Sequence, residues 1–201
     1  MFAFSIYDKS INKIFIARTF NGGIKWDELP VERRPVVDSG EAMFASSGTN
    51  VRALDKKEAI IVTGGLRSRL IRRDDKIDLP ILQGTQSTGA NSVGVKKNTI
   101  IVVGGDFSAK DNTEKNCVIS NDKGKTFHAP KASPTGYRSC IEYLNKKNWI
   151  TCGLNGVDIS ADNGENWKNI STEGFHVCRK AKDGKAVFFA GSNGKIGKLL
   201  A

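Results

Sequence analysis

One eight-residue pattern recurs along this chain and restricts its fold more than any other feature. The segments SNDKGKTF (120–127) and SADNGENW (160–167) both read serine, any residue, aspartate, any residue, glycine, two more residues and an aromatic ring. TFNGGIKW (19–26) repeats the pattern with threonine in place of serine and asparagine in place of aspartate. The pattern could be part of a catalytic site, a metal-binding loop or a structural turn, and each reading predicts a different protein.

The residue types favour the turn. In a tight hairpin an Asp or Asn side chain accepts backbone N–H groups of its own turn, and glycine supplies a positive φ. The exchange of Asp for Asn at residue 21 keeps the acceptor but removes the charge that catalysis would need. A calcium loop would need further oxygen ligands at short spacing, so we expect no metal and no cofactor. We assign to structural turns Thr19, Asn21, Gly23 and Trp26, then Ser120, Asp122, Gly124 and Phe127, and finally Ser160, Asp162, Gly164 and Trp167.

Short β-rich runs that end in glycine recur along the chain. They are AIIVTGG (59–65), TIIVVGG (99–105), NWITCG (148–153) and AVFFAG (186–191), and an earlier strand opened by a glycine precedes each one. The opening glycines, Gly48, Gly89, Gly136 and Gly174, follow one another at intervals of roughly 40 residues, the length of a four-stranded propeller blade. No segment shows convincing helical periodicity.

These repeats predict an all-β fold, a single β-propeller domain over residues 1–201 with four-stranded antiparallel blades. The approximate blades are 1–36 (partial), 37–85, 86–133, 134–172 and 173–201 (partial). The pattern should occupy the turn between the third and fourth strand of a blade. In the second unit LRSRLIRRDDKIDLP replaces it, so that turn is degenerate.

Composition excludes some functional classes. The formal net charge is +10, yet the basic residues are scattered along the sequence and no stacking aromatics are interleaved with them. We therefore interpret them as a solvated surface and expect no nucleic-acid partner. No apolar run approaches the ~20 residues of a membrane span, and the N-terminus lacks the features of a signal peptide.

The four cysteines are not spaced as zinc ligands. Cys140 and Cys152 could face each other on adjacent strands, so one disulfide between them is possible. Burial as small apolar side chains is the alternative for most of them.

The pattern and the segments around it resemble a known family. SADNGENW, IIVVGGD and EGFHVCRKAKDGKAVFFAGSNGKIGKL are similar to blades of Asp-box (BNR-repeat) propellers, most of all the bacterial photosystem II stability/assembly factor-like propellers. Many of these carry the label oxidoreductase, but the chain has no GxGxxG after a strand and no CxxC. The resemblance implies a non-enzymatic scaffold that binds a protein or peptide.

Family members of this kind resemble rings of about seven blades, whereas this chain holds four to five at ~45 residues each. The resemblance thus implies part of a larger ring, or a truncated product whose full-length form is exported from the cytoplasm. A shorter ring closed by the two partial blades is the alternative. An open arc would expose strand edges and invite self-association.

Candidate ligand-binding residues follow from the alignment of the repeats. Two positions after each opening glycine stand Asn50, Asn91, Arg138 and His176, which equivalent blades would bring together at the channel mouth. Arg52, Tyr137 and Phe175 stand beside them, and the loops after each second strand add Arg67, Asp106, Asn155 and Asn193. Such a positively biased polar pocket would suit a carboxylate or an acidic peptide. The alternative is that these residues satisfy backbone groups of the channel.

Three functions fit the sequence. The first is the peptide-binding scaffold, and the second is a purely structural repeat domain of a surface protein. The third is a sialidase-like glycoside hydrolase, which could recruit Arg52, Arg138, Tyr137 and Glu142, although the Arg-Ile-Pro signature of such enzymes is missing. The charged loop 107–116 is expected to be mobile, as a tolerated insertion or a partner contact.

Overall fold

Five antiparallel sheets follow one another along the chain in the computed structural model, which describes residues 2–8, 12–55, 58–73 and 75–200. The first sheet contains β1 (Phe2–Asp8), β2 (Lys13–Thr19) and β3 (Asp27–Glu28), and the second β5 (Val51–Ala53), β6 (Ala59–Val62), β8 (Arg69–Arg72) and β9 (Asp75–Asp78). The third contains β10 (Thr88–Lys96), β11 (Thr99–Asp106) and β12 (Cys117–Ser120), and short β7 (Gly64–Gly65) and β4 (Glu41–Ala42) extend it. The fourth contains β13 (Cys140–Asn145), β14 (Asn148–Gly153), β15 (Gly156–Ser160) and β16 (Lys168–Ser171). The fifth contains β17 (Val177–Lys180), β18 (Ala186–Ala190) and β19 (Ile196–Leu200).

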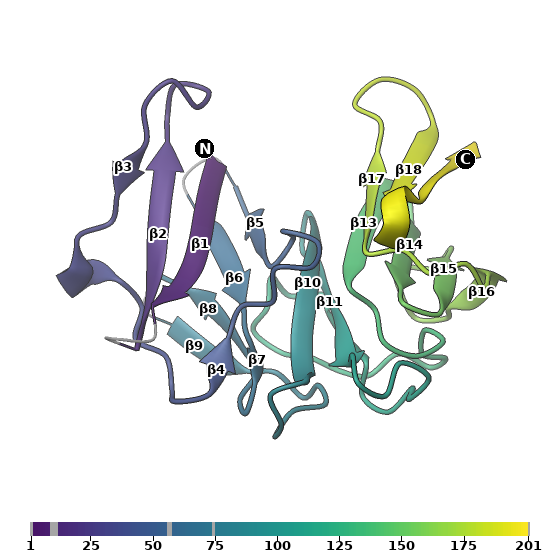
Figure 1. Ribbon diagram of the computed structural model, residues 1–201, viewed down its shortest axis with the longest axis horizontal. Helices are drawn as coiled ribbons and strands as arrows, with labels where there is room; N and C mark the ends of the chain where they lie inside the picture. The colour runs from purple at the N-terminus through teal and green to yellow at the C-terminus, as the bar shows by residue number, and fades with distance from the viewer. Residues whose placement is uncertain (1, 9–11, 56–57, 74, 201) are drawn as a thin grey trace.

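The sheets are arranged as successive blades of an arc (Figure 1). The strands β5, β10, β13 and β17 lie side by side at its inner edge. Arg52 Nε of β5 donates to Val93 O of β10 at 3.1 Å, and Ile141 N of β13 donates to Ser92 Oγ of β10 at 3.0 Å. Cys140 Sγ of β13 lies 3.4 Å from Cys178 O of β17. In the described part of the chain only two short 3-10 turns, η1 (Val31–Arg33) and η2 (Ser192–Gly194), are helical, so the predicted all-β propeller fold is confirmed.

Apolar layers between neighbouring blades form the core. Strand β11 reads as a continuous apolar run because both of its faces are buried. Ile100 and Val102 pack toward the second blade, whereas Ile101 and Val103 pack toward the fourth. A third layer, which includes Cys140, Cys152, Phe175, Cys178 and Val187, lies between the fourth and fifth blades.

The recurring pattern forms hydrogen-bonded turns, which we name the Thr19 turn (19–26), the Ser120 turn (120–127) and the Ser160 turn (160–167). Ser120 Oγ donates to Asp122 Oδ1 at 2.8 Å and accepts the N–H of Gly124 at 2.8 Å. Asp122 Oδ1 accepts the N–H groups of Lys125 and Thr126, each at 3.0 Å. The bonds from Thr126 hold the pKa of Asp122 well below its usual range.

The other two turns repeat this arrangement. In the Ser160 turn the serine hydroxyl binds Asp162 and the N–H of Gly164. In the Thr19 turn the threonine hydroxyl binds Asn21 and the N–H of Gly23. The aromatic residues differ, because Phe127 and Trp167 pack against the blade layers whereas Trp26 is 45% exposed.

The Ser120 and Ser160 turns lie beside the hairpins that join the first and second strands of their blades, on one face of the arc. Lys123 N of the Ser120 turn donates to Asn98 O of the β10–β11 hairpin at 2.9 Å. Asn163 N of the Ser160 turn donates in the same way to Lys147 O of the β13–β14 hairpin, also at 2.9 Å. Figure 1 shows this face at the top, with the Thr19 turn on the left and the β17–β18 hairpin on the right. We call it the hairpin face, and the opposite one the loop face.

All four cysteines are buried free thiols. Cys140 and Cys152 are direct partners in the β13–β14 register, as the sequence suggested, and Cys178 joins them in the same layer. Burial raises the pKa of the Cys117 thiol. No helix in the described ranges has the length and hydropathy to cross a membrane.

Candidate functional site

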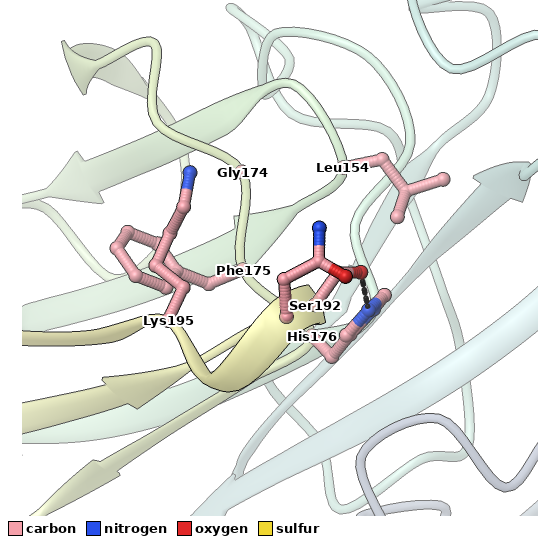
Figure 2. A pocket seen from close by; sticks show the side chains of 7 residues that line it. Leu154, Gly174, Phe175, His176, Ser192 and Lys195 are labelled. Carbon is pink, nitrogen blue, oxygen red and sulfur yellow. Dashed lines mark hydrogen bonds between the residues drawn. The ribbon is translucent and has the colours of Figure 1, made fainter.

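A pocket of about 220 Å³ opens between the fourth and fifth blades (Figure 2). Its walls come from the loop between β14 and β15, the segment that enters β17, and the loop between β18 and β19. The lining residues are Leu154, Gly174, Phe175, His176, Ser192, Asn193 and Lys195. The pocket lies on the loop face, which is the face where the sequence predicts a ligand.

The backbone around β17 and β18 positions His176. Its N–H donates to Ala190 O at 2.8 Å, so the residue continues the pairing of the two strands. Its ring Nε2 lies 2.8 Å from Ser192 Oγ, the contact drawn as a dashed line in Figure 2. Asn193 and Gly194 both have positive φ, which turns the η2 backbone sharply and places Ser192 over the imidazole.

Lys195 and Phe175 form the other side of the pocket. The Lys195 ammonium lies 5.8 Å from the centre of the Phe175 ring and 2.6 Å from Glu173 Oε2. The hydrogen bond from Lys195 lowers the pKa of Glu173. Lys195 is 45% exposed, so a ligand carboxylate could compete with Glu173 for it. The pocket therefore combines a cation, hydroxyl and amide groups, and an apolar wall.

Arg138 is not accessible at this site, contrary to the sequence expectation. Its side chain is fully buried, and its Nε donates to Asp158 Oδ2 at 2.5 Å. Its Nη1 donates to Tyr137 O at 2.8 Å and to Asn155 Oδ1 at 2.6 Å. Burial lowers the pKa of Arg138, and the adjacent Asp158 opposes that effect. The positive charge of the guanidinium is therefore balanced by Asp158 inside the fourth blade, and Arg138 cannot bind a ligand in the pocket.

Asn50, Asn91 and Tyr137 are also buried. Asn50 Nδ2 donates to Phe44 O at 2.8 Å, and the Tyr137 hydroxyl donates to Asn91 Oδ1 at 2.9 Å. Burial raises the pKa of Tyr137 to about 12. These side chains satisfy polar groups of the channel wall, which is the alternative that the sequence left open for them. They do not form a common open ring with His176.

Arg52 is bonded to the inner strands of the neighbouring blades and does not line the pocket. Its Nη2 donates to Glu142 Oε2 at 2.8 Å, and Arg179 Nη1 lies 3.8 Å from the same oxygen. Burial raises the pKa of Glu142, although both arginines act in the opposite direction. This cluster joins the inner strands of the second, fourth and fifth blades.

The four loop residues that the sequence adds to this face also lie apart from one another. Arg67 forms ion pairs with Asp38 and Asp78, and Asp106 accepts the N–H of Ser108. Of these four loop residues, only Asn193 lines the pocket. Asn155 instead donates to Asp111 of the loop 107–116 at 2.8 Å.

The loop 107–116, which the sequence predicts to be mobile, is bonded to the fourth blade at two points. The Asn155 bond to Asp111 holds one point of it, and Tyr137 N donates to Lys110 O at 2.8 Å. Two points of attachment on the fourth blade therefore bind this loop of the third blade.

Sequence reasoning missed Leu154, Ser192 and Lys195 in the pocket, and Asp158 beside Arg138. The sequence did contain an indication of Asp158, because an acidic residue inside the apolar run of β15 needs a buried cation as its partner. The segment SNGK (192–195) had a weaker one, since Asn-Gly marks a tight turn. Among the described residues, no group of three or more His, Cys, Asp or Glu side chains could hold a metal ion.

Comparison with known proteins supports the fold. No protein-family model matches the sequence, and no curated protein matches it. The chain is similar to the solved structure titled "YCF48 bound to D1 peptide", with a TM-score of 0.51, 14% identity, and coverage of 82% of this chain and 57% of that one. It is also similar to an ancestral GH74 enzyme, with a TM-score of 0.52, 12% identity, and coverage of 92% of this chain and 27% of that one.

A gluconolactonase from Xanthomonas campestris is similar too, with a TM-score of 0.51, 10% identity, and coverage of 89% of this chain and 65% of that one. This chain therefore spans less than two thirds of each of these structures. At such identities the likeness shows a shared β-propeller fold.

Proposed function

We propose that this chain is a non-enzymatic propeller scaffold that binds an acidic peptide segment of a protein partner at the loop face. The observation that carries the proposal is the pocket beside His176 and Lys195. Lys195 and the Ser192 hydroxyl can donate to a carboxylate, and Leu154 and Phe175 offer an apolar wall to the neighbouring side chain. Ser192 Oγ lies within hydrogen-bond distance of His176 Nε2, but the lining residues include no Asp or Glu that would orient the imidazole as a base.

The similar fold of YCF48, solved with a D1 peptide, supports a peptide ligand for a propeller of this kind. We also propose that the Thr19, Ser120 and Ser160 turns are Asp-box repeats of the assembly factor-like propellers. Their shared hydrogen bonds, from the hydroxyl group to Oδ1 of the Asp or Asn two residues later, support this assignment.

The sialidase-like alternative receives no support from the side-chain positions. Tyr137 and Arg138 are buried and have partners inside the protein, and Glu142 is paired with Arg52 near the axis. These residues do not converge on the open pocket, so a substrate carboxylate would not meet an arginine cluster there.

The test uses fluorescein-labelled peptides that contain Asp or Glu, compared with the same peptides containing Asn or Gln. We expect fluorescence anisotropy to show binding of the acidic set only. The double variant His176→Ala with Lys195→Gln should bind at least about tenfold more weakly, because it loses a charge-assisted hydrogen bond. Equal affinity of wild type and variant would remove the pocket from the proposal.

Lys168→Gln is the matched control for charge. Lys168 lies on β16 of the fourth blade and is exposed, so its loss changes net charge equally without touching the pocket. We expect its affinity to equal that of the wild type. A similar loss in both variants would mean that peptides are attracted only by the net charge.

A further inference from the structure

The hairpin face gathers lysines that are scattered in the sequence. The hairpins of the third, fourth and fifth blades each contribute two, and the Ser120 turn contributes two more. All are exposed, and we call the following set the lysine face: Lys96, Lys97, Lys123, Lys125, Lys146, Lys147, Lys182 and Lys185. The lysine ion pairs of the described chain involve other residues, namely Lys25, Lys110, Lys115 and Lys195. The lysine face therefore carries positive charge without acidic partners among the described residues.

Direct contacts join these hairpins into one surface. Lys96 of the third blade lies 4.7 Å from the centre of the Tyr143 ring of the fourth, and the Tyr143 hydroxyl donates to Lys146 O at 3.3 Å. Lys180 of the fifth blade donates to Leu144 O of the fourth at 2.6 Å. The Ser120 turn joins the same surface through the bond from Lys123 N to Asn98 O.

The backbone at three of these lysines is strained. Lys97, Lys123 and Lys146 have φ of 55°, 63° and 47°, the left-handed region that glycine or asparagine adopts more easily. A chain under selection for stability alone would place those residues there. Lysine at three exposed turns of one face keeps positive charge where asparagine or glycine would be less strained, as Lys115 does elsewhere with a φ of 46°.

An apolar tip lies on the same face. In the Thr19 turn, Phe20 is 67% exposed, Ile24 88% and Trp26 45%, and Lys25 stands between the last two. This turn joins β2 and β3, and Figure 1 shows it at the same edge as the β17–β18 hairpin. Exposed Trp, Phe and Ile side chains next to lysines are typical of segments that enter the membrane interface.

We propose that the hairpin face binds the surface of an anionic lipid bilayer. The lysine face would lie against the headgroups, and the tip formed by Phe20, Ile24 and Trp26 would enter the interface. Lysine is a point charge suited to diffuse attraction, whereas specific phosphate recognition in nucleic acids favours arginine. Tyr143, the ring that lies among these lysines, is covered by Lys96 and is not free to stack on a base. The peptide pocket, on the opposite face, would then point away from the membrane, and neither proposal depends on the other.

The test is co-sedimentation of the full chain with vesicles of phosphatidylcholine, alone or mixed with phosphatidylserine. We expect binding to the mixed vesicles only, and weaker binding as salt increases. The triple variant Lys97→Asn, Lys123→Asn, Lys146→Asn should bind about a hundredfold more weakly, since each surface lysine contributes about fivefold. Asparagine tolerates positive φ, so this variant should fold at least as stably as the wild type.

The matched control is Arg33→Gln, Lys110→Gln, Lys115→Asn, which removes the same charge outside the hairpin face. Lys115 has φ of 46°, so it also matches the backbone change. We expect this control to bind vesicles as the wild type does. An equal loss in both triple variants would show attraction by net charge alone and would overturn the proposed face.

The tip is tested separately. Phe20→Ser with Ile24→Ser leaves the charge unchanged and should weaken vesicle binding about tenfold or more, because it removes apolar area from the interface. Trp149 and Trp167 are buried, so a blue shift of tryptophan emission on vesicle binding would report Trp26.

Two results would overturn the lipid proposal. One is failure of the wild type to sediment with phosphatidylserine vesicles at low salt. The other is binding of a DNA duplex that the lysine variant abolishes while its vesicle binding stays unchanged, which would assign the face to nucleic acid.

Discussion

The fourth and fifth blades place different chemistry at equivalent positions. Arg138 and His176 both stand two residues after the opening glycine of their blades. Asp158 pairs with Thr151 on the neighbouring strand, and the corresponding residue of the fifth blade, Lys198, pairs with Phe188. Arg138 therefore meets a carboxylate, whereas His176 meets none from that position.

Gly197 of β19 leaves space for the Phe175 ring in the fifth blade. A Cβ at Gly197 would lie 2.9 Å from Phe175 Cζ, so the Phe175 ring occupies the room that a longer side chain would need. His176 stays at the surface and bonds to Ser192. Because β19 has no acidic residue, the fifth blade has an open pocket where the fourth has a buried ion pair.

The largest expected effect comes from Asp158. Asp158→Ala should destabilise the protein by about 3–5 kcal/mol, because it leaves Arg138 buried and unpaired. His176→Ala, at the equivalent position of the fifth blade, should cost less than about 1 kcal/mol. Urea denaturation followed by circular dichroism measures both, and equal losses would contradict the difference between the blades.

The double variant Arg138→Met with Asp158→Leu sharpens that result. Replacing both partners of a buried ion pair by apolar side chains is often close to neutral, so we expect it to recover most of the lost stability. A double variant as unstable as Asp158→Ala would show that the pair organises more of the blade than its own charges.

The next effect concerns the Ser160 turn of the fourth blade. Ser160 is buried and its hydroxyl accepts the N–H of Gly164, so Ser160→Ala should cost about 1–3 kcal/mol by leaving that group unsatisfied. Ser192→Ala in the fifth blade is the control and should change stability by less than about 0.5 kcal/mol, since its hydroxyl is exposed. Thermal unfolding measured side by side compares them.

A smaller effect should appear in acid. Partial burial raises the pKa of Asp162, but the hydrogen bonds from Asn166 and Ser160 outweigh it, so the pKa is lowered overall. A lowered folded pKa adds stability above the unfolded value of about 4, and that stability is lost as pH falls through the folded pKa.

Asp162→Asn should therefore reduce the loss of stability on acidification. It should fold, because Asn21 accepts the equivalent bonds in the Thr19 turn. Urea midpoints measured from pH 6 down to acid would test this, and parallel curves for the two proteins would contradict it.

The smallest effect separates the hairpins of the two blades. The fourth-blade hairpin has Lys146 at positive φ, whereas the fifth-blade hairpin has Gly184. Lys146→Asn should stabilise the protein by about 0.5 kcal/mol, while Gly184→Asn should be close to neutral. Differential scanning calorimetry can resolve both, and a destabilised Lys146→Asn would show that the lysine side chain has a structural role.

The fold could be predicted from the sequence because its signals are local. In each turn the Ser or Thr, the Asp or Asn, and the glycine lie within five residues, so the hydrogen bonds between them form within one short segment. Strand β11 revealed its burial by an unbroken apolar run. Neither signal depends on which residues a neighbouring blade supplies.

The site could be predicted only in part, because it depends on contacts between strands and between blades. The position of His176 on the loop face followed from the repeat. Whether its neighbours were open or buried did not, since Asp158 approaches Arg138 from another strand.

The sequence by itself determined the class of fold and the turns, because the repeats encode them with nearby residues. The tertiary structure decided which polar side chains are neutralised and which remain accessible, because that choice rests on partners brought close by sheet pairing. It also decided where the positive charge collects. Lysines of separate hairpins share one face only because successive blades repeat the same orientation around the axis.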